Sequence, residues 1–193
     1  MTLYYVYYNY QGRLKMNNNL SKTTILLHWL TGLTFILVLC LGFYFDYLPK
    51  GPEKGDIMGL HKSFGTIVFI VALIRLFWRF KEGSITSIAK LTRLQSILAT
   101  SIHHLLLLAT LLMPISGITM SISGGRGLTV FGQEIVAGGS EKIEWLGALA
   151  NTIHTGAVNV IVLILFLHIA GAVKHQFIDK DGTISRMLGN FHK

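Results

Sequence analysis

Histidines are the chemically active side chains that stand out in this otherwise apolar chain, which contains eight of them. Six fall inside long apolar stretches: His28, His61, His103, His104, His154 and His168. Ionisable side chains are costly inside a bilayer and usually mark a function there. Imidazole is also among the commonest protein ligands of metals. The histidines therefore predict metal chemistry within the apolar part of the protein.

Two of these histidines share the last apolar stretch, where His154 and His168 are fourteen residues apart. On an α-helix this spacing gives about 21 Å of rise and falls roughly 40° short of four full turns. Both imidazoles should therefore lie on one helix face at two heights. His61 is expected at the height of His154 and His28 near that of His168, so the spacing predicts two stacked centres.

The outer pairing of His61 with His154 is nearly forced, because no other histidine is expected on that side. The inner pairing of His28 with His168 stays open, because three more histidines are expected near that surface: His103, His104 and His175. A single membrane histidine is often only a hydrogen-bond partner between helices. Two matched pairs in one small chain favour metal binding over that alternative.

The metal is best identified from what the outer pair lacks. Zinc usually takes three or four protein ligands, whereas His61 and His154 have no intramembrane carboxylate nearby. Two imidazoles alone suit a haem iron, because the porphyrin supplies the other four ligands. The single cysteine, Cys40, and the absence of Cys-x-x-Cys-His exclude covalent attachment. We therefore expect two haem b groups, which transfer electrons because both axial positions of each iron are filled.

Long apolar helices must position these histidines. Hydrophobic residues make up 51% of the chain and charged residues only 13%, about half the share in a soluble domain. Three stretches without charge, 23–45, 94–125 and 145–173, exceed the roughly 20 residues that span a bilayer. We predict transmembrane helices near 23–45, 58–80, 96–122 and 147–175, which exclude a soluble enzyme, a disulfide scaffold and a nucleic-acid-binding domain.

The second predicted helix is the least obvious, because Lys62, Arg75 and Arg79 interrupt it. Haem propionates would give these cations partners. Arg75 and Arg79 lie four residues apart on one face and suit the inner haem, while Lys62 and Arg126 are candidates on the outer side. Alternatively, Arg75 and Arg79 only anchor the helix at the inner surface.

Other side chains keep two interpretations. Neighbouring helix residues differ by about 100°, so His103 and His104 cannot both face the core. One of them is expected to contact a haem, a propionate or a quinone, unless both are structural. Four glycines either allow close helix packing or make room for the porphyrin: Gly32, Gly65, Gly156 and Gly171.

Orientation follows from the positive charges. The side that holds both termini and the loop near 81–95 carries 12 of the 17 Lys and Arg residues, so we expect it to be cytoplasmic. The predicted fold is an all-α, four-helix membrane bundle with both termini cytoplasmic. We expect an N-terminal tail over 1–20, a haem-binding membrane domain over 21–178 and a short cytoplasmic tail over 179–193. The glycine-rich segment near 123–146 is expected to be a flexible outer loop.

The first fifteen residues are rich in tyrosine and lack a helical stripe. The segment from Met16 to Lys22 is a more natural start, with Ser21 as a helix N-cap. Our hypothesis is that translation begins at Met16 and that residues 1–15 are a mis-assigned start, which the intact mass of the native protein tests.

Several motifs resemble the prokaryotic cytochrome b561 family. They are Leu27-His28-Trp29-Leu30, Leu60-His61, Arg75-Leu76-Phe77-Trp78-Arg79, Met113-Pro114-Ile115-Ser116-Gly117, and His154 with His168. The tail from Lys180 to Leu188 is similar to the family's ending, and the likeness covers about 18–190. It implies a di-haem b-type cytochrome of the bacterial inner membrane that exchanges electrons with ubiquinone and ubiquinol.

By this resemblance, His28 and His168 ligate one haem and His61 and His154 the other. His103 matches the family's histidine in the third helix better than His104 does. Some members are similar to a superoxide oxidase, which passes an electron from external superoxide to quinone. This chain departs from the positively charged approach expected of such an enzyme, because its outer segments hold five basic and six acidic residues. Lys62 and Arg126 could still form a local positive site.

Alternative functions remain. The chain could be the cytochrome b subunit of a dehydrogenase complex, reduced by a partner protein, although its short loops offer little docking surface. It could also be a non-redox carrier that passes metal ions or protons between histidines, although it lacks intramembrane carboxylates and broken helices. A structural bundle is the third alternative. A visible spectrum with haem quantification distinguishes these classes.

Overall fold

The computed structural model describes residues 7–8, 14–15, 19–83, 85–139 and 141–190 of the 193-residue chain. Met16, the start proposed from the sequence, lies outside them. Four long apolar segments are long enough to span a membrane, which confirms the predicted helical membrane protein. They are helix α1 (Lys22–Tyr47), helix α2 (Pro52–Glu82), helix α3 (Arg93–Ser123) and a fourth span over Glu144–Ile178.

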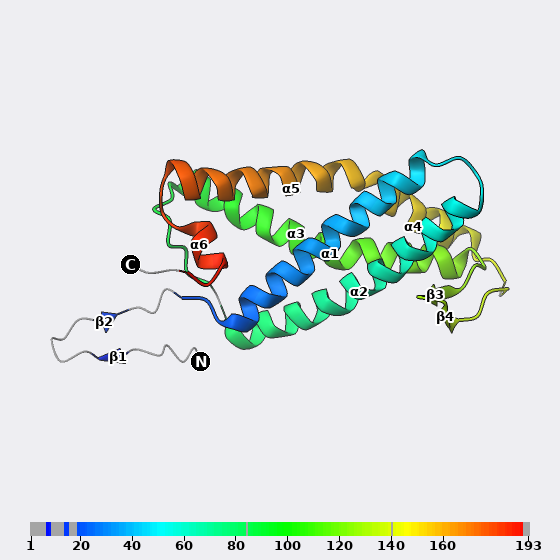
Figure 1. Ribbon diagram of the computed structural model, residues 1–193, viewed down its shortest axis with the longest axis horizontal. Coiled ribbons are helices and arrows are strands. Elements are labelled where there is room, and N and C mark those ends of the chain that lie inside the picture. The colour runs from blue at the N-terminus through cyan, green and yellow to red at the C-terminus, as the bar shows by residue number, and fades with distance from the viewer. Residues whose placement is uncertain (1–6, 9–13, 16–18, 84, 140, 191–193) are drawn as a thin grey trace.

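The fourth span is divided, whereas the sequence predicted one helix near 147–175. Helix α4 (Glu144–Gly156) ends next to Ala157, and helix α5 (Val158–Val173) continues into the π-helix η1 (Lys174–Ile178). Helix α6 (Thr183–Met187) follows. Figure 1 shows α4 and α5 meeting at an angle. Ala157 keeps right-handed helical dihedral angles and bonds to Ile153, so the break is local.

Local side-chain chemistry sets the helix ends. Ser21 accepts a hydrogen bond from the Thr24 N–H at 3.1 Å, as predicted for the cap of α1. Thr92 and Gln95 form a reciprocal capping box at the start of α3. Helix α2 begins with Pro52, six residues before its predicted start near 58. Proline suits a first helical turn because its missing N–H has no partner there.

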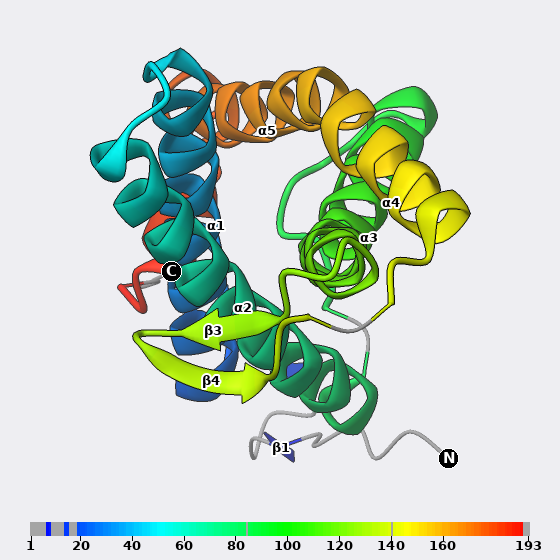
Figure 2. The ribbon, with the colours of Figure 1, turned by 90° about the vertical axis from the view of Figure 1, so that its right-hand side faces the viewer.

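The helices form a bundle whose two ends differ. Helix α1 packs on α2, α2 packs on α3, and α3 packs on both α4 and α5. Figure 2 views the bundle from the end that carries strands β3 (Leu128–Val130) and β4 (Gln133–Val136), which we call the hairpin end. Helix α6 and the start of α1 lie at the opposite end, which we call the tail end. Two further strands, β1 (Tyr7–Tyr8) and β2 (Leu14–Lys15), pair before α1.

The β3–β4 hairpin is attached to the bundle, although the sequence predicted a flexible loop there. The Phe131 N–H donates to Ser63 Oγ of α2 at 2.9 Å, and the Phe131 ring contacts Phe64 edge-on at 5.3 Å. Gly127 has a φ of +62°, and a Cβ there would lie 2.4 Å from the Val136 carbonyl oxygen. Glycine at 127 therefore allows the strands to approach.

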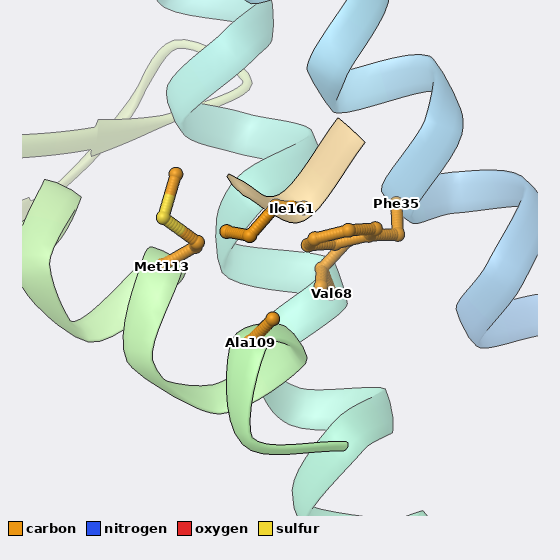
Figure 3. Packing of buried hydrophobic residues seen from close by; sticks show 5 residues of the cluster. All are labelled: Phe35, Val68, Ala109, Met113 and Ile161. Carbon is orange, nitrogen blue, oxygen red and sulfur yellow. The ribbon is translucent and has the colours of Figure 1, made fainter. Parts of the chain in front are cut away.

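A small apolar cluster occupies the middle of the bundle. It consists of Phe35, Val68, Ala109, Met113 and Ile161, one or two residues from each span (Figure 3). The outward faces of the helices are also apolar, with many exposed leucine, isoleucine and phenylalanine side chains. A soluble monomer rarely exposes so large an apolar surface, so these faces suit lipid.

The central cluster lies midway between the histidine levels. Phe35 and Val68 each follow a histidine of their own helix, His28 or His61, by seven residues. Ile161 likewise lies seven residues after His154 and seven before His168. Seven helical residues rise about 10 Å, so the cluster separates two levels of histidines.

Candidate functional site

The histidines of the hairpin end are His61 of α2 and His154 of α4. Their ring centres lie 6.1 Å apart and their planes cross at 84°. His61 Nδ1 lies 3.0 Å from the Val38 carbonyl oxygen, and His154 Nδ1 lies 3.0 Å from that of Met113. A carbonyl can only accept, so these contacts require a proton on each Nδ1. Ser116 Oγ also lies 3.0 Å from His154 Nδ1 and donates its own proton to the Met113 carbonyl, so this hydroxyl can accept from the ring as well. The Nε2 of each ring is then left with a free lone pair.

The tail end brings together three histidines from three helices. His28 of α1 and His168 of α5 have ring centres 6.1 Å apart, with 54° between their planes. His103 of α3 approaches the same His168 ring to 5.2 Å, nearly edge-on. An Arg75 guanidinium nitrogen of α2 lies 3.4 Å from His28 Nδ1. Histidines 28, 103 and 168 therefore converge beside a cation.

Ring separation distinguishes between the possible pairs. A metal–imidazole nitrogen bond is about 2 Å long, so two axial ligands place their nitrogens roughly 4 Å apart and their ring centres about 6 Å apart. The pairs His28–His168 and His61–His154 both meet this requirement at 6.1 Å. The His103–His168 separation of 5.2 Å is too short. Among the described residues, no carboxylate joins either pair in a three-ligand cluster.

Two glycines that the sequence analysis did not assign to the site press against the hairpin-end histidines. A Cβ at Gly117 would lie 3.0 Å from His154 Cε1, and one at Gly42 would lie 3.2 Å from His61 Cε1. Both distances are shorter than ordinary carbon contacts. The sequence signal for Gly117 was its place in the Met113–Gly117 motif, whereas Gly42 stands in an apolar run without a distinguishing pattern.

The four glycines singled out from the sequence behave differently. A Cβ added at Gly32, Gly65, Gly156 or Gly171 would meet no atom within 4 Å. Close helix packing would place an atom of a neighbouring helix within this distance. The absence of such an atom at the four glycines does not support the packing interpretation. Gly32 and Gly65 each lie one turn after a paired histidine, and Gly171 lies three residues after another. No protein side chain fills the space beside these glycines, so packing does not prevent a bound group from lying there.

The four basic side chains proposed as propionate partners differ in burial and in the contacts they already make. Arg75 is half-buried beside His28, whereas Arg79 donates to the Gly83 carbonyl at 2.7 Å and closes the end of α2. At the hairpin end, half-buried Lys62 lies near enough to Arg126 for their charges to interact. Arg126 is exposed and also contacts the Met120 carbonyl oxygen at 3.3 Å.

Two other histidines in the described part of the chain, His104 and His175, lie outside both pairs. His104 is exposed, and its Nδ1 donates to the Thr100 carbonyl of its own helix at 2.9 Å. His175 interacts with two aspartates beyond α5. Of the neighbours His103 and His104, it is thus His103 that approaches the tail-end pair.

Known proteins similar to this chain indicate one family. The model of the family described as prokaryotic cytochrome b561 matches residues 19–190. "Cytochrome b561 homolog 2" of Escherichia coli (strain K12) is 31% identical over 176 residues, which cover 84% of this chain and 87% of that protein. "Cytochrome b561 homolog 1" of the same organism is 26% identical over 172 residues, which cover 89% of this chain and 97% of that protein.

Proposed function

The chain belongs to the prokaryotic cytochrome b561 family of membrane b-type cytochromes that transfer electrons, and from this premise we propose that it carries electrons between two haem b groups. His61 and His154 hold one haem at the hairpin end, and His28 and His168 hold the other at the tail end. The observation that carries this proposal is the ring separation of 6.1 Å in both pairs.

The protein fixes the hairpin-end ligands before a cofactor arrives. The Val38 and Met113 carbonyls hold the Nδ1 protons of His61 and His154, which orients each Nε2 and makes it a stronger ligand. Bound haem iron supplies the redox chemistry, because it accepts and releases one electron. The apolar cluster between the two levels, which includes Phe35, keeps water and protons from following the electron.

Arg75 is the proposed propionate partner at the tail end. Arginine can only donate, so its contact with His28 Nδ1 requires that nitrogen to accept. Ligation through His28 Nε2 instead needs the ring proton on Nδ1. The guanidinium must then turn to another acceptor, and a carboxylate is the one it bonds best. Lys62 and Arg126 are the corresponding candidates at the hairpin end, and His103 is a candidate partner of a propionate or a quinone.

We assign the tail end to the cytoplasm and the protein to the bacterial inner membrane. This rests on the excess of Lys and Arg at that end. The domain division is then a membrane domain over 21–178, flanked by the N-terminal segment 1–20 and a cytoplasmic tail over 179–193. Ubiquinone is the proposed electron partner within the bilayer.

The hairpin end supports a more specific activity, the oxidation of periplasmic superoxide. Lys62 and Arg126 place two positive charges near each other, which attracts a small anion even where the outer surface is not positive overall. Two superoxide anions would each release one electron and leave as O2. The two electrons would pass one at a time from the hairpin end to the tail end, where one ubiquinone would take both of them with two protons to become ubiquinol. The chain would in that case act as a superoxide:ubiquinone oxidoreductase.

One protein preparation tests both the electron-transfer function and the more specific superoxide activity. Protein purified alone with ample haem supply should show a reduced b-type spectrum and two haems per chain. A colourless preparation would favour an ion carrier. A superoxide pulse should then reduce the haems rapidly, and Lys62→Gln should slow that reduction when the rate is compared at equal haem content. If only a co-purified dehydrogenase reduced the haems, the chain would be the membrane subunit of a complex.

A further inference from the structure

Beyond the fourth span, at the tail end, one imidazole faces two carboxylates. His175 lies in η1, and Asp179 and Asp181 follow it in the turn that leads to α6. His175 Nδ1 lies 2.9 Å from Asp179 Oδ2 and 2.9 Å from Asp181 Oδ2. All three ligand atoms fall within 4.8 Å of one another. These residues lie outside the two histidine pairs and play no part in the proposed electron path.

The donor set indicates a divalent cation. Nδ1 of a neutral imidazole carries at most one proton, so it can serve only one of the two carboxylates well. A cation at the centre of the three atoms would contact both carboxylates and the imidazole lone pair. Zinc binds imidazole nitrogen and carboxylate oxygen at about 2.0–2.2 Å and favours four ligands. We propose that His175, Asp179 and Asp181 form a divalent transition-metal site of the zinc type, completed by water.

The turn holds the donors in place before any cation binds. Asp181 Oδ1 accepts hydrogen bonds from the Thr183 N–H at 2.9 Å and the Thr183 hydroxyl at 2.6 Å. Asp181 N–H also donates to the His175 carbonyl at 3.1 Å. These contacts direct the other oxygen, Oδ2, toward the imidazole. Support of this kind strengthens metal sites, and π-helical turns recur at functional sites.

Lys174 is the charge that a cation must displace. Its Nζ lies 2.5 Å from Asp179 Oδ2, and its side chain, 45% exposed, can swing into solvent. A cleft of about 430 Å³ adjoins the cluster and gives room for the water ligand. The other charged groups on this cleft are Lys90 and Lys180. Their positive charges repel a bound cation, so we expect a site that exchanges its cation readily.

A cation here would join the fourth span to the C-terminal helix. Helix α6 begins two residues after Asp181, and it docks on α1 through the Trp29 Nε1–H, which donates to the Met187 carbonyl at 2.7 Å. Bound metal would therefore hold α6 against the tail end. Metal removal should loosen this docking without removing either haem ligand pair.

Equilibrium dialysis of the full-length, haem-loaded protein against micromolar Zn²⁺ tests the site. Wild type should bind one zinc per chain, whereas His175→Ala and Asp181→Asn should bind it at least tenfold more weakly. His104→Ala is the matched control, because it removes an exposed histidine outside the cluster and should leave affinity unchanged. Equal haem content in all proteins verifies that they fold.

Two further measurements keep the outcome decisive. X-ray absorption at the zinc edge should show nitrogen and oxygen donors at about 2.0–2.2 Å, and His175→Cys should retain zinc with a sulfur donor at about 2.3 Å. Hydrogen exchange over 183–190 should slow when zinc is added to wild type but not to Asp181→Asn. Unchanged zinc uptake in the His175→Ala/Asp181→Asn double variant, or no uptake by wild type, would overturn the proposal. Neither result affects the haem assignment, which the spectrum tests separately.

Discussion

The imidazole rings of His61 and His154 face each other 6.1 Å apart with nearly perpendicular planes, at 84°. The tail-end rings have the same separation but cross at 54°. Perpendicular axial ligands leave two iron d orbitals nearly equal in energy, which makes the ferric electron spin resonance signal strongly anisotropic. We expect two low-spin signals, of which the more anisotropic belongs to the hairpin-end pair. Its selective loss in His154→Ala checks this assignment, and loss of the other signal instead would reverse it.

Substitution of either histidine of a pair should remove the same haem. His61→Ala and His154→Ala should each reduce the haem content from two per chain to one, and the double variant should lose no more, because we propose that both rings bind one iron. His28→Ala and His168→Ala should likewise remove the tail-end haem. Pyridine haemochrome analysis measures the content, with His104→Ala as the unaffected control. If His28→Ala retained both haems and His103→Ala lost one, the tail-end haem ligand would be His103 and not His28.

Gly117→Ala should weaken the hairpin-end site. In a free helix position, alanine stabilises by about 0.5–1 kcal/mol over glycine. Here the new Cβ would lie 3.0 Å from His154 Cε1, so the ring must shift by a few tenths of an ångström, and we expect this shift to strain its hydrogen bond to the Met113 carbonyl. We expect faster haem loss and a lower unfolding temperature. Gly59→Ala is the control, because a Cβ there meets nothing within 4 Å, and it should leave the unfolding temperature unchanged or raise it. A raised unfolding temperature in Gly117→Ala would contradict the predicted contact with His154.

Arg75→Gln should lower the midpoint potential of the tail-end haem, because a nearby positive charge favours the reduced iron. A unit charge roughly 8 Å away at an effective dielectric constant of about 20 contributes about 2 kcal/mol, which corresponds to somewhat under 100 mV for one electron. Redox titration measures the shift. Arg79→Gln should shift it less, since Arg79 bonds to Gly83. An unchanged potential in Arg75→Gln would favour the anchor interpretation.

Trp29→Phe should loosen the C-terminal helix. It removes the hydrogen bond to the Met187 carbonyl, and such a bond contributes about 1 kcal/mol, or roughly a fivefold change in opening. Limited proteolysis within 183–190 should accelerate accordingly. Trp145→Phe, an exposed tryptophan at the opposite end, should leave the rate unchanged, and equal acceleration in both would point to a general loss of stability.

The histidine levels could be predicted because helical spacing is regular. The interval between His154 and His168 sets both height and face, and the only partner available to His154 on its side was His61. The inner pair could not be decided that way, because His28 and His103 reach the same height. The two ring separations, 6.1 Å for His28–His168 and 5.2 Å for His103–His168, favour our proposal of His28, and these distances depend on packing between helices far apart in sequence.

Other features escaped prediction for physical reasons. Helix α2 begins at Pro52, beyond the apolar residues that hydropathy detects, because a proline and charged first turn can project past the membrane core. The hairpin depends on a hydrogen bond from Phe131 to Ser63, 68 residues apart, which no local pattern encodes. Gly42 likewise matters only through a ring on another helix.

The placement of Phe35, Val68 and Ile161 between the histidine levels has an electrical consequence. Fourteen residues of a straight helix rise about 21 Å, so the divided fourth span separates the levels by at most roughly two thirds of a hydrocarbon core about 30 Å thick. An electron moved between them without a companion proton would change in free energy by at most about 1.5 kcal/mol per 100 mV of membrane voltage. With the tail end in the cytoplasm, as we propose, electron flow toward that end would charge the cytoplasmic side negatively and slow as the cell becomes energised.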